Sequence, residues 1–158
     1  MNEASIRKDL GDFSSIICLK SIVIALEEIM GESAARGNLI LAGRKRGRSI
    51  ADNLSLSNTD KPMAEWSAML REAIGKTGTR LCNIISIEEQ NNIIQVLLSD
   101  TICSANEAPG SSRQLTFTLG VIQGAVEAIT GRAFISVQTG SVLRGQDYDI
   151  IEFKDRKK

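Results

Sequence analysis

An amphipathic stretch with regularly spaced glycines places the strongest constraint on how this chain can fold. A serine hydroxyl at Ser111 or Ser112 can cap a new helix. Five apolar residues then recur at steps of four and three, which puts them on one stripe of an α-helix: Leu115, Leu119, Ile122, Val126 and Ile129. We expect Gly131 to end this helix in a left-handed cap, and 133–143 to return along it as a strand.

Small residues recur four apart on the neighbouring stripe of the same helix, at Gly120, Gly124 and Ala128. A glycine inside a helix lowers its stability by about 1 kcal/mol relative to alanine, so the pattern indicates a packing reason. Without side chains on this stripe, the backbone of a neighbouring element can come close. An earlier pair with the same spacing, Gly43 and Gly47, could form either a dimer contact or packing within one chain.

Length and charge predict one soluble domain without an affinity for polyanions. The chain has 158 residues, of which 42% are hydrophobic, enough for a sizeable core. We expect 1–158 to form this domain, with a polar lead-in at 1–13 and a charged tail at 154–158. Nineteen basic and nineteen acidic residues cancel, so no overall field favours nucleic acid or an anionic membrane. The longest apolar stretch, 16–30, contains charged residues and is too short to span a bilayer.

The residue types that are absent or scarce limit the catalytic and metal-binding functions that this chain can have. Histidine is absent, which removes the commonest general base and the commonest neutral metal ligand. No dinucleotide-binding fingerprint follows a predicted strand, so we assign no catalytic residue. The cysteines, Cys18, Cys82 and Cys103, are odd in number and widely spaced. That pattern favours buried, reduced thiols in a cytoplasmic protein over disulfides or a zinc site.

The order of periodic segments predicts the fold class. We expect helices at about 15–30 (capped by Ser14), 34–54 (capped by Ser33), 62–74 and 111–131, with strands at 79–87, 93–103, 133–143 and 147–153. Two hairpins separated by one long helix make an antiparallel four-stranded sheet with helices packed on one face. The expected class is α+β, with an N-terminal helical pair.

Two long segments carry a family resemblance. The stretches at 25–52 and 119–153 read ALEEIMGESAARGNLILAGRKRGRSIAD and LGVIQGAVEAITGRAFISVQTGSVLRGQDYDIIEF. With the hairpin between them, the chain resembles the vinyl-4-reductase domain, also called the predicted hydrocarbon-binding domain, over about 16–153. The resemblance implies a fold shared with subunits of the TRAPP tethering complex and related to haem-based nitric-oxide sensors. It also implies dimerisation and a hydrophobic ligand between helices and sheet.

A departure from the family concerns metal. Many members bind zinc through a glutamate and two cysteines around the last hairpin, and the matching places here are Gln138, Ser141 and Asp149. None of these is a thiolate, and an amide, a hydroxyl and one carboxylate make a poor structural zinc site. We therefore predict no metal and no cofactor.

Large apolar residues give the candidate ligand pocket: Trp66, Leu70, Leu115, Leu119, Ile122, Val126 and Phe134. Mostly apolar linings are typical of small-molecule pockets, but the same residues could equally fill a solid core. The first two helices give the candidate homodimer interface: Leu19, Val23, Leu26, Gly43 and Gly47. The basic cluster 44–48 could bind an anionic group or form a solvated face.

These observations lead to one functional hypothesis and two alternatives. The hypothesis is non-catalytic binding of a hydrophobic small molecule in an apolar pocket, as a dimeric sensor or carrier. One alternative is an accessory role in tetrapyrrole vinyl-group reduction, the activity after which the family is named. The other is a ligand-free scaffold whose core is solid.

Overall fold

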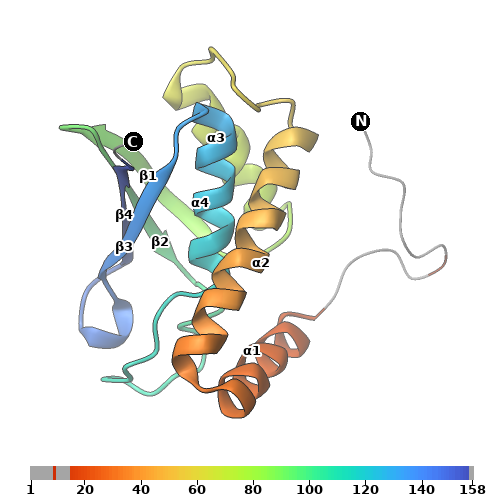
Figure 1. Cartoon of the computed structure of the whole chain (residues 1–158), viewed down its shortest axis with the longest axis vertical. Coiled ribbons are helices and arrows are strands. Elements are labelled where there is room, and N and C mark those ends of the chain that lie inside the picture. The colour runs from red at the N-terminus through yellow and green to blue at the C-terminus, as the bar shows by residue number, and fades with distance from the viewer. Residues whose placement is uncertain (1–8, 10–14, 157–158) are drawn as a thin grey trace.

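The computed structural model describes residue 9 and residues 15–156 (Figure 1). The helices are α1 (Ile16–Met30), α2 (Glu32–Asn53), α3 (Met63–Ile74) and α4 (Phe117–Thr130), and a short 3₁₀ turn, η1, spans Val142–Arg144. The strands are β1 (Asn83–Gln90), β2 (Ile93–Ser99), β3 (Phe134–Gly140) and β4 (Asp149–Asp155). Apart from Asp9, the predicted polar lead-in lies outside the described residues.

The four strands form one antiparallel sheet in the order β1-β2-β4-β3. The two predicted hairpins meet along β2 and β4, where Val96 lies opposite Ile151. Alternate residues of these strands are fully buried, as expected for a sheet with one covered face. The predicted α+β class, with an antiparallel four-stranded sheet and helices packed on it, is confirmed.

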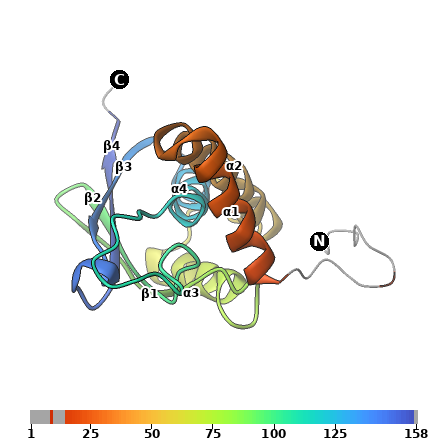
Figure 2. The same ribbon diagram turned by 90° about the horizontal axis from the view of Figure 1, so that it is seen from below.

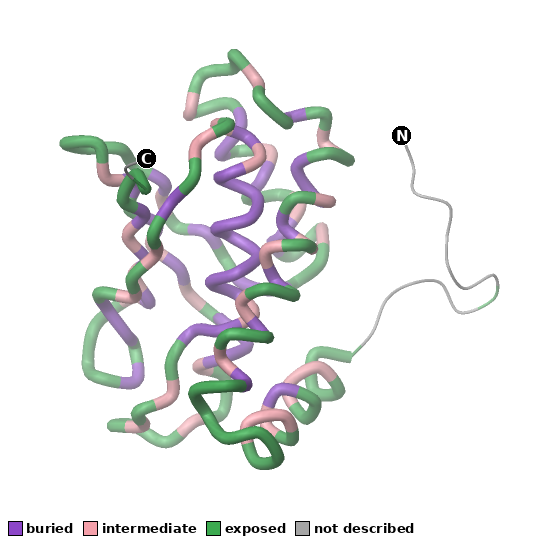
Figure 3. Tube along the Cα trace, in the orientation of Figure 1, coloured by how far each residue is buried: buried purple, intermediate pink, exposed green. Residues whose placement is uncertain are grey.

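Helix α4 lies at the centre of the molecule. It packs between the sheet and α2, while α1 lies against α2 and α3 packs on β1 (Figures 1 and 2). All residues of α4 except Phe117, Ala128 and Thr130 are buried (Figure 3). A helix that is buried all round is mostly apolar or small, and α4 has leucine, isoleucine and valine on one stripe and glycine on another, while its buried polar residues Gln123 and Glu127 are hydrogen-bonded.

Helix starts differ from the expected ones by one to six residues. Ser15 caps α1, since its hydroxyl accepts a hydrogen bond from the Ile17 N–H at 3.2 Å, and Ser14, the predicted cap, lies outside the described residues. Gly31 turns the chain with a φ of 80°, so α2 begins at once and Ser33 lies within its first turn. Leu115 precedes α4, because its N–H donates to Oε1 of Gln138 at 2.8 Å outside the helical ladder.

Helix ends follow the expected signals. Helix α3 stops before Gly75, and Gly131 ends α4 in the left-handed conformation with a φ of 67°.

Strand bounds shift because irregular backbone interrupts the expected runs. Arg80 (φ 56°) delays β1 to Asn83, and Asp100 (φ 51°) ends β2. At the other end of the chain, β4 continues through Lys154 and Asp155, which the sequence had assigned to the charged tail. The Asp155 carboxylate accepts hydrogen bonds from the Arg132 guanidinium at 3.0 and 2.8 Å, which ties this end of β4 to the start of β3.

Helices α2 and α4 cross with their backbones in contact, and four glycines make this possible. A Cβ added to Gly47 would lie 2.6 Å from the Ala125 nitrogen, and one added to Gly124 would lie 2.7 Å from the Arg44 carbonyl carbon. Such distances are too short for a side chain. Gly43 and Gly120 meet the partner backbone in the same way.

The glycine contact settles one alternative that the sequence left open. Gly43 and Gly47 are buried inside one chain against α4, so their assignment to a dimer interface was wrong. The sequence could not separate the two alternatives, because small residues are needed wherever two helix backbones approach closely, whether within one chain or between two chains. Among the described residues, no helix has both the length and the hydropathy needed to cross a membrane.

The helix crossing generates a stability prediction. Gly47→Ala and Gly124→Ala should each destabilise the protein, because backbone crowding exceeds the helix-propensity gain of about 1 kcal/mol from alanine. Gly37→Ala is the matched control: Gly37 lies in α2 with nothing within 4 Å of an added Cβ, so this variant should be slightly more stable. Urea unfolding of the three variants measures both effects. Equal stabilisation at all three positions would contradict the crossing.

Candidate functional site

The seven predicted pocket residues come together in the structure as one buried cluster. Trp66 and Leu70 lie on α3, Phe134 begins β3, and the other four are Leu115, Leu119, Ile122 and Val126. Each is at most 4% exposed. The pockets described below are lined by other residues, so the role of this cluster as a ligand cavity stays a prediction.

An apolar pocket lies under the first turn of α1, and we call it the α1 pocket. Its volume is about 240 Å³. Four segments line it: Ser15, Ile16 and Leu19; Arg46 and Ile50; Thr79 and Leu81; and Phe117 and Val121. Six of these nine residues are apolar, and Arg46 is the one charged residue among them.

Local structure fixes each wall of the α1 pocket. Phe117 and Val121 are one turn apart on α4, on a different side from Leu119 and Ile122 of the core cluster. The loop after α3 is fixed by its backbone, since the Leu81 N–H donates to the Ile74 carbonyl at 2.9 Å. The rigid walls are therefore α2, α4 and this loop, and α1 supplies the remaining side.

The α1 pocket adjoins a second, more polar pocket of about 570 Å³. The two share Ser15, Ile16, Thr79 and Leu81. The second pocket is completed by residues of both charges and by apolar ones: Arg80, Asp100, Ile102 and Ala105. A ligand in the α1 pocket could thus extend past Ile16 toward the loop after β2.

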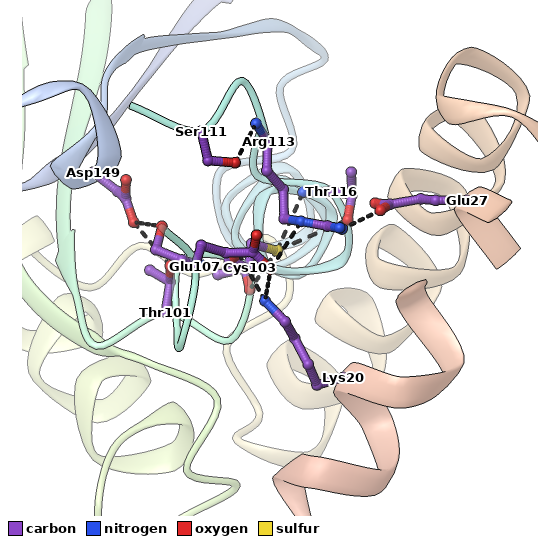
Figure 4. A network of polar contacts seen from close by, with 11 residues as sticks. Lys20, Glu27, Thr101, Cys103, Glu107, Ser111, Arg113, Thr116 and Asp149 are labelled. Atoms are coloured by element: carbon purple, nitrogen blue, oxygen red, sulfur yellow. Dashed lines mark hydrogen bonds and ion pairs between the residues drawn. The ribbon is translucent and has the colours of Figure 1, made fainter. Parts of the chain in front are cut away.

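Four charged residues tie α1 to the loop between β2 and α4, and we call them the α1 clamp (Figure 4). Nζ of Lys20 lies 2.6 Å from Oε1 of Glu107 and donates to the Cys103 carbonyl at 3.2 Å. The Arg113 guanidinium binds the Glu27 carboxylate and has its Nε 3.0 Å from Oε1 of Glu107. Helix α1 is thereby attached at two points along its length.

Electrostatics favour the charged forms of two residues of the α1 clamp, Glu107 and Arg113. Burial acts to raise the pKa of Glu107, but Lys20 and Arg113 outweigh it and lower that pKa below its ordinary value. Burial likewise acts to lower the pKa of Arg113, and Glu27 and Glu107 raise it instead. The contribution of Glu107 to stability is therefore present above its unfolded pKa and is lost as the pH falls through the lowered folded value.

The residues at the family's zinc positions act as hydrogen-bonding groups here. Asp149 is fully buried, and its carboxylate accepts from the Thr101 hydroxyl at 2.8 Å, the Ser104 hydroxyl at 2.7 Å and the Val142 N–H at 3.1 Å. Gln138 binds backbone through Oε1 and Nε2, and the Ser141 hydroxyl accepts from the Leu143 N–H. This donor set does not fit zinc.

Other groups of metal ligands are also absent from the described residues. No group of three or more cysteine, aspartate or glutamate side chains lies close enough to hold a metal ion there. Cys82 and Cys103 are buried free thiols, as expected, whereas Cys18 is exposed on the outer side of α1. Burial, with smaller effects from Cys103, Asp100 and Asp149, raises the pKa of Cys82 to about 12, so that thiol is unreactive near neutrality.

The basic cluster 44–48 does not form one site. Arg44 donates to Oε2 of Glu127 at 2.6 Å, and Arg48 lies 3.5 Å from the same oxygen. Arg46 points to the α1 pocket, and Lys45 is exposed near the outer face of α2. Successive helical residues point in different directions, which explains the separation.

Glu127 is a buried carboxylate that the sequence analysis did not single out. Its other oxygen accepts from Nε2 of Gln123 at 3.0 Å and from the Phe134 N–H at 3.2 Å. Burial acts to raise the pKa of Glu127, but hydrogen bonds from Arg44, Gln123 and Phe134 lower it below its ordinary value. The available signal was that Glu127 is the one charged residue of a mostly apolar helix.

The three remaining predicted dimer residues face inward. Val23 is buried with Ala35 and Leu39 of α2, and Leu26 packs on this small cluster. Leu19 packs on the main core and lines the α1 pocket. Any dimer contact of α1 must therefore use its opposite side.

Neither a family model nor a curated protein matches the chain, whereas solved structures do. The phenol-responsive sensory domain of the transcription activator PoxR, solved with phenol, matches with a TM-score of 0.65 and 16% identity, over 91% of this chain and 76% of that one. Trafficking protein particle complex subunit 3 from Naegleria fowleri, covalently bound to palmitic acid, matches with a TM-score of 0.51 and 14% identity, over 90% and 98%.

The comparisons show a TRAPP-like fold. The expected relation to TRAPP subunits is thereby confirmed at the level of the fold. Membership in the vinyl-4-reductase family stays a prediction.

The Glu127 contacts predict a pH-dependent loss of stability. Glu127→Gln should destabilise the protein by about 1.5–3 kcal/mol near pH 7, because it removes the charged acceptor of Arg44. Since the folded-state pKa is lowered, this stabilisation is complete above the unfolded value of about 4.3 and is lost as the pH falls through the folded value. Urea unfolding as a function of pH should show the two proteins converging below about pH 4. A constant difference down to low pH would contradict the ion-pair account.

Proposed function

We propose that this chain is a non-catalytic module that binds a hydrophobic small molecule, with the ligand in the α1 pocket. The observation that carries the proposal is the pocket's construction: six apolar residues from four segments surround one space with one charged residue among them. Pockets that are mostly apolar with few polar groups are typical of small-molecule sites. We further propose a cytoplasmic location, as the unpaired cysteines suggest.

Two features of other proteins support this proposal. One structural neighbour is a phenol-responsive sensory domain, and another is solved with covalently bound palmitic acid. Both names refer to small hydrophobic molecules, and this chain shares their fold. The two neighbours support a hydrophobic small molecule as the type of ligand, and they do not indicate a particular compound.

The core cluster has a defined place in the proposal. Leu119, Ile122 and Val126 form the side of α4 that faces the sheet, and Phe117 and Val121 of the same helix line the α1 pocket. In this proposal the core cluster packs behind α4 and holds that wall of the α1 pocket in place. A ligand cavity within the cluster itself, between helices and sheet, is the competing location.

The ligand-free scaffold is the alternative that a specific observation favours. The predicted pocket residues are at most 4% exposed and pack on one another, as in a solid core. For tetrapyrrole chemistry, the volume of the α1 pocket is unfavourable, since it lies below the range of about 300–1,000 Å³ that drug-sized ligands occupy.

The ligand location can be tested on one turn of α1. Ile16 is 42% exposed at the mouth of the α1 pocket, and Ile17 is 73% exposed beside it without lining any pocket described above. Ile16→Trp should abolish binding of phenol and octan-1-ol in calorimetric titrations, while Ile17→Trp should bind like the parent protein. A parent protein that binds neither probe would leave the scaffold alternative.

Ile122→Phe distinguishes the two ligand locations. In a filled core, the extra volume should destabilise the fold by about 1–3 kcal/mol and leave probe binding by the remaining folded protein unchanged. Beside a cavity in the core cluster, the same change should cost little stability and should weaken probe binding. The second result, with normal binding by Ile16→Trp, would move the site into the core.

We also propose that the module is a homodimer through the outer side of α1. Four residues at steps of four, three and four form one exposed stripe there: Cys18, Ile22, Ala25 and Ile29. Ile22 is 57% exposed and Ile29 is 81% exposed. Solvent exposure of such side chains is unfavourable, and a second copy of the same stripe would cover them.

Sedimentation at micromolar concentration tests the dimer. The parent protein should have twice the monomer mass of 17.1 kDa. The double variant Ile22→Glu/Ile29→Glu should sediment as a monomer with little change in melting temperature, since both positions are exposed. Ile135→Glu, at a 56% exposed position on the sheet, is the matched control and should stay dimeric. A monomeric parent protein would overturn this proposal.

A further inference from the structure

We infer that α1 is a lid on the α1 pocket, which turns about Gly31 and is held closed by the contact between Lys20 and Glu107. This inference rests on the proposed function and adds the step that controls how fast a ligand enters and leaves. Three observations support it: the position of the hinge, the small apolar attachment of α1, and the position of the charged contacts along the helix.

The connection between α1 and α2 has the properties of a hinge. Gly31 alone joins the two helices, its φ is 80°, and no atom lies within 4 Å of an added Cβ. Hinges are commonly residues at the ends of elements, and glycine restricts φ and ψ least. At 1.5 Å per residue, Ile16 lies about 22 Å from Gly31, so a rotation of about 15° would move it by about 6 Å. The pocket end of α1 therefore moves furthest.

Apolar packing holds α1 less strongly than it holds the other helices. Val23 is the one buried residue of α1, whereas eleven of the fourteen residues of α4 are buried. Val23 and Leu26 pack in a small cluster separate from the main core, which Leu19 alone of these three contacts. A segment with few buried apolar contacts has a low free energy of local opening.

The Lys20 contact is the part of the α1 clamp that resists opening most (Figure 4). Nζ of Lys20 lies 2.6 Å from Oε1 of Glu107, and both side chains are only 16% exposed, so water screens this ion pair less than a surface pair. Lys20 lies about 16 Å from Gly31, whereas Glu27 lies only about 6 Å from it. A small rotation must therefore break the Lys20 contact but stretches the Glu27 contact little.

Rotation of α1 would uncover the pocket without moving its other walls. Ser15, Ile16 and Leu19 are the three lining residues at the pocket end of α1. The other six lining residues lie on α2, on α4 and in the loop after α3. The backbone contact between α2 and α4 holds two of these walls in place. Opening therefore changes the access to the pocket more than its shape.

A lid has a kinetic signature that a merely structural contact lacks. The Lys20 contact belongs to the closed protein with or without ligand, so its removal should favour opening equally in both forms. Association and dissociation of the ligand should then become faster by the same factor, and the dissociation constant should not change. Loss of a residue that only holds the ligand would speed dissociation alone and would weaken binding.

Lys20→Met tests the lid, because methionine keeps the apolar stem and removes the ammonium group, while Glu107 keeps Arg113 as its partner. The line shapes of the Leu81 methyl signals during an NMR titration with octan-1-ol give both rate constants. Each should be about tenfold or more above the value of the parent protein, the effect expected for one charge-assisted contact. The dissociation constant should stay the same.

Two further variants set the scale of the Lys20→Met result. Glu27→Gln removes the contact near the hinge and should speed association and dissociation less than Lys20→Met does. Lys61→Met is the matched control, since it removes another lysine–glutamate pair that involves no residue of α1. Its rate constants should equal those of the parent protein.

Native-state hydrogen exchange tests the opening without any ligand. A detached helix of 15 residues is marginal in water, so the amide hydrogens of α1 should exchange when the lid opens. This opening exposes little surface, whereas the amide hydrogens of α4 need global unfolding. Low urea concentrations should therefore speed exchange in α4 but not in α1. Equal urea dependence of the two helices would overturn the lid.

The outcomes of the titrations separate the lid from the proposed function. Octan-1-ol binding with rate constants that Lys20→Met does not change, or with an unchanged association rate and a weaker affinity, would overturn the lid and leave the proposed function intact. Absence of octan-1-ol binding by the parent protein would overturn the proposed function and the role of the lid in ligand exchange together. If Lys20→Met does not fold, as judged by circular dichroism, Glu107→Gln decides by the same measurements, since it removes the same contact.

Discussion

The close contact between the backbones of α2 and α4 is the constraint on which the rest of the structure depends. Gly43 and Gly47 face Gly120 and Gly124 across this contact, and a Cβ at any of the four would collide with the partner backbone. Glycines weaken isolated helices, so these helices gain their stability from tertiary packing. The contact lets one helix be covered by the sheet on one side and by α2 on the other (Figure 2).

Because α4 lies at the centre of the molecule, its different sides contact different parts of the structure. Leu119, Ile122 and Val126 fill the core against the sheet, while Phe117 and Val121 line the α1 pocket. Glu127 fixes the far end, because it accepts hydrogen bonds from α2, from α4 itself and from the start of β3. The relative position of two walls of the pocket, α2 and α4, is therefore set by both backbone contact and a partly buried ion pair.

Helix α1 is attached differently from the rest of the domain. Its contacts with α2 centre on Val23 and Leu26, a cluster separate from the main core, and Leu19 and the α1 clamp supply the other attachments. Few buried apolar contacts give a low free energy of local opening. The α1 pocket has walls on α2, α4 and the loop after α3 and one wall on this helix, so the proposed ligand could enter without disturbing the sheet.

The sequence pattern predicted element order, fold class and the ends of α3 and α4, because apolar periodicity and glycine punctuation are local signals. It misplaced Leu115 and Ser33, since a long-range hydrogen bond from the Leu115 N–H to Gln138 and the turn at Gly31 decide those helix starts. The seven residues predicted as a ligand pocket lie together in one buried cluster, and their role as a pocket stays a prediction, while the sequence did not indicate the α1 pocket. The lining of this pocket comes from four separate segments. The periodicity of apolar residues is a local signal, so it does not indicate that Leu81 lies near Ile16.

The central claim is that a hydrophobic ligand binds in the α1 pocket, and a methyl NMR titration tests it most directly. The protein, labelled at the isoleucine, leucine and valine methyl groups, would be titrated with octan-1-ol. The account predicts saturable shift changes at the methyl groups of the pocket lining: Ile16, Leu19, Ile50, Leu81 and Val121. Changes confined to Leu119, Ile122 and Val126, or no saturable change at any methyl group, would contradict it.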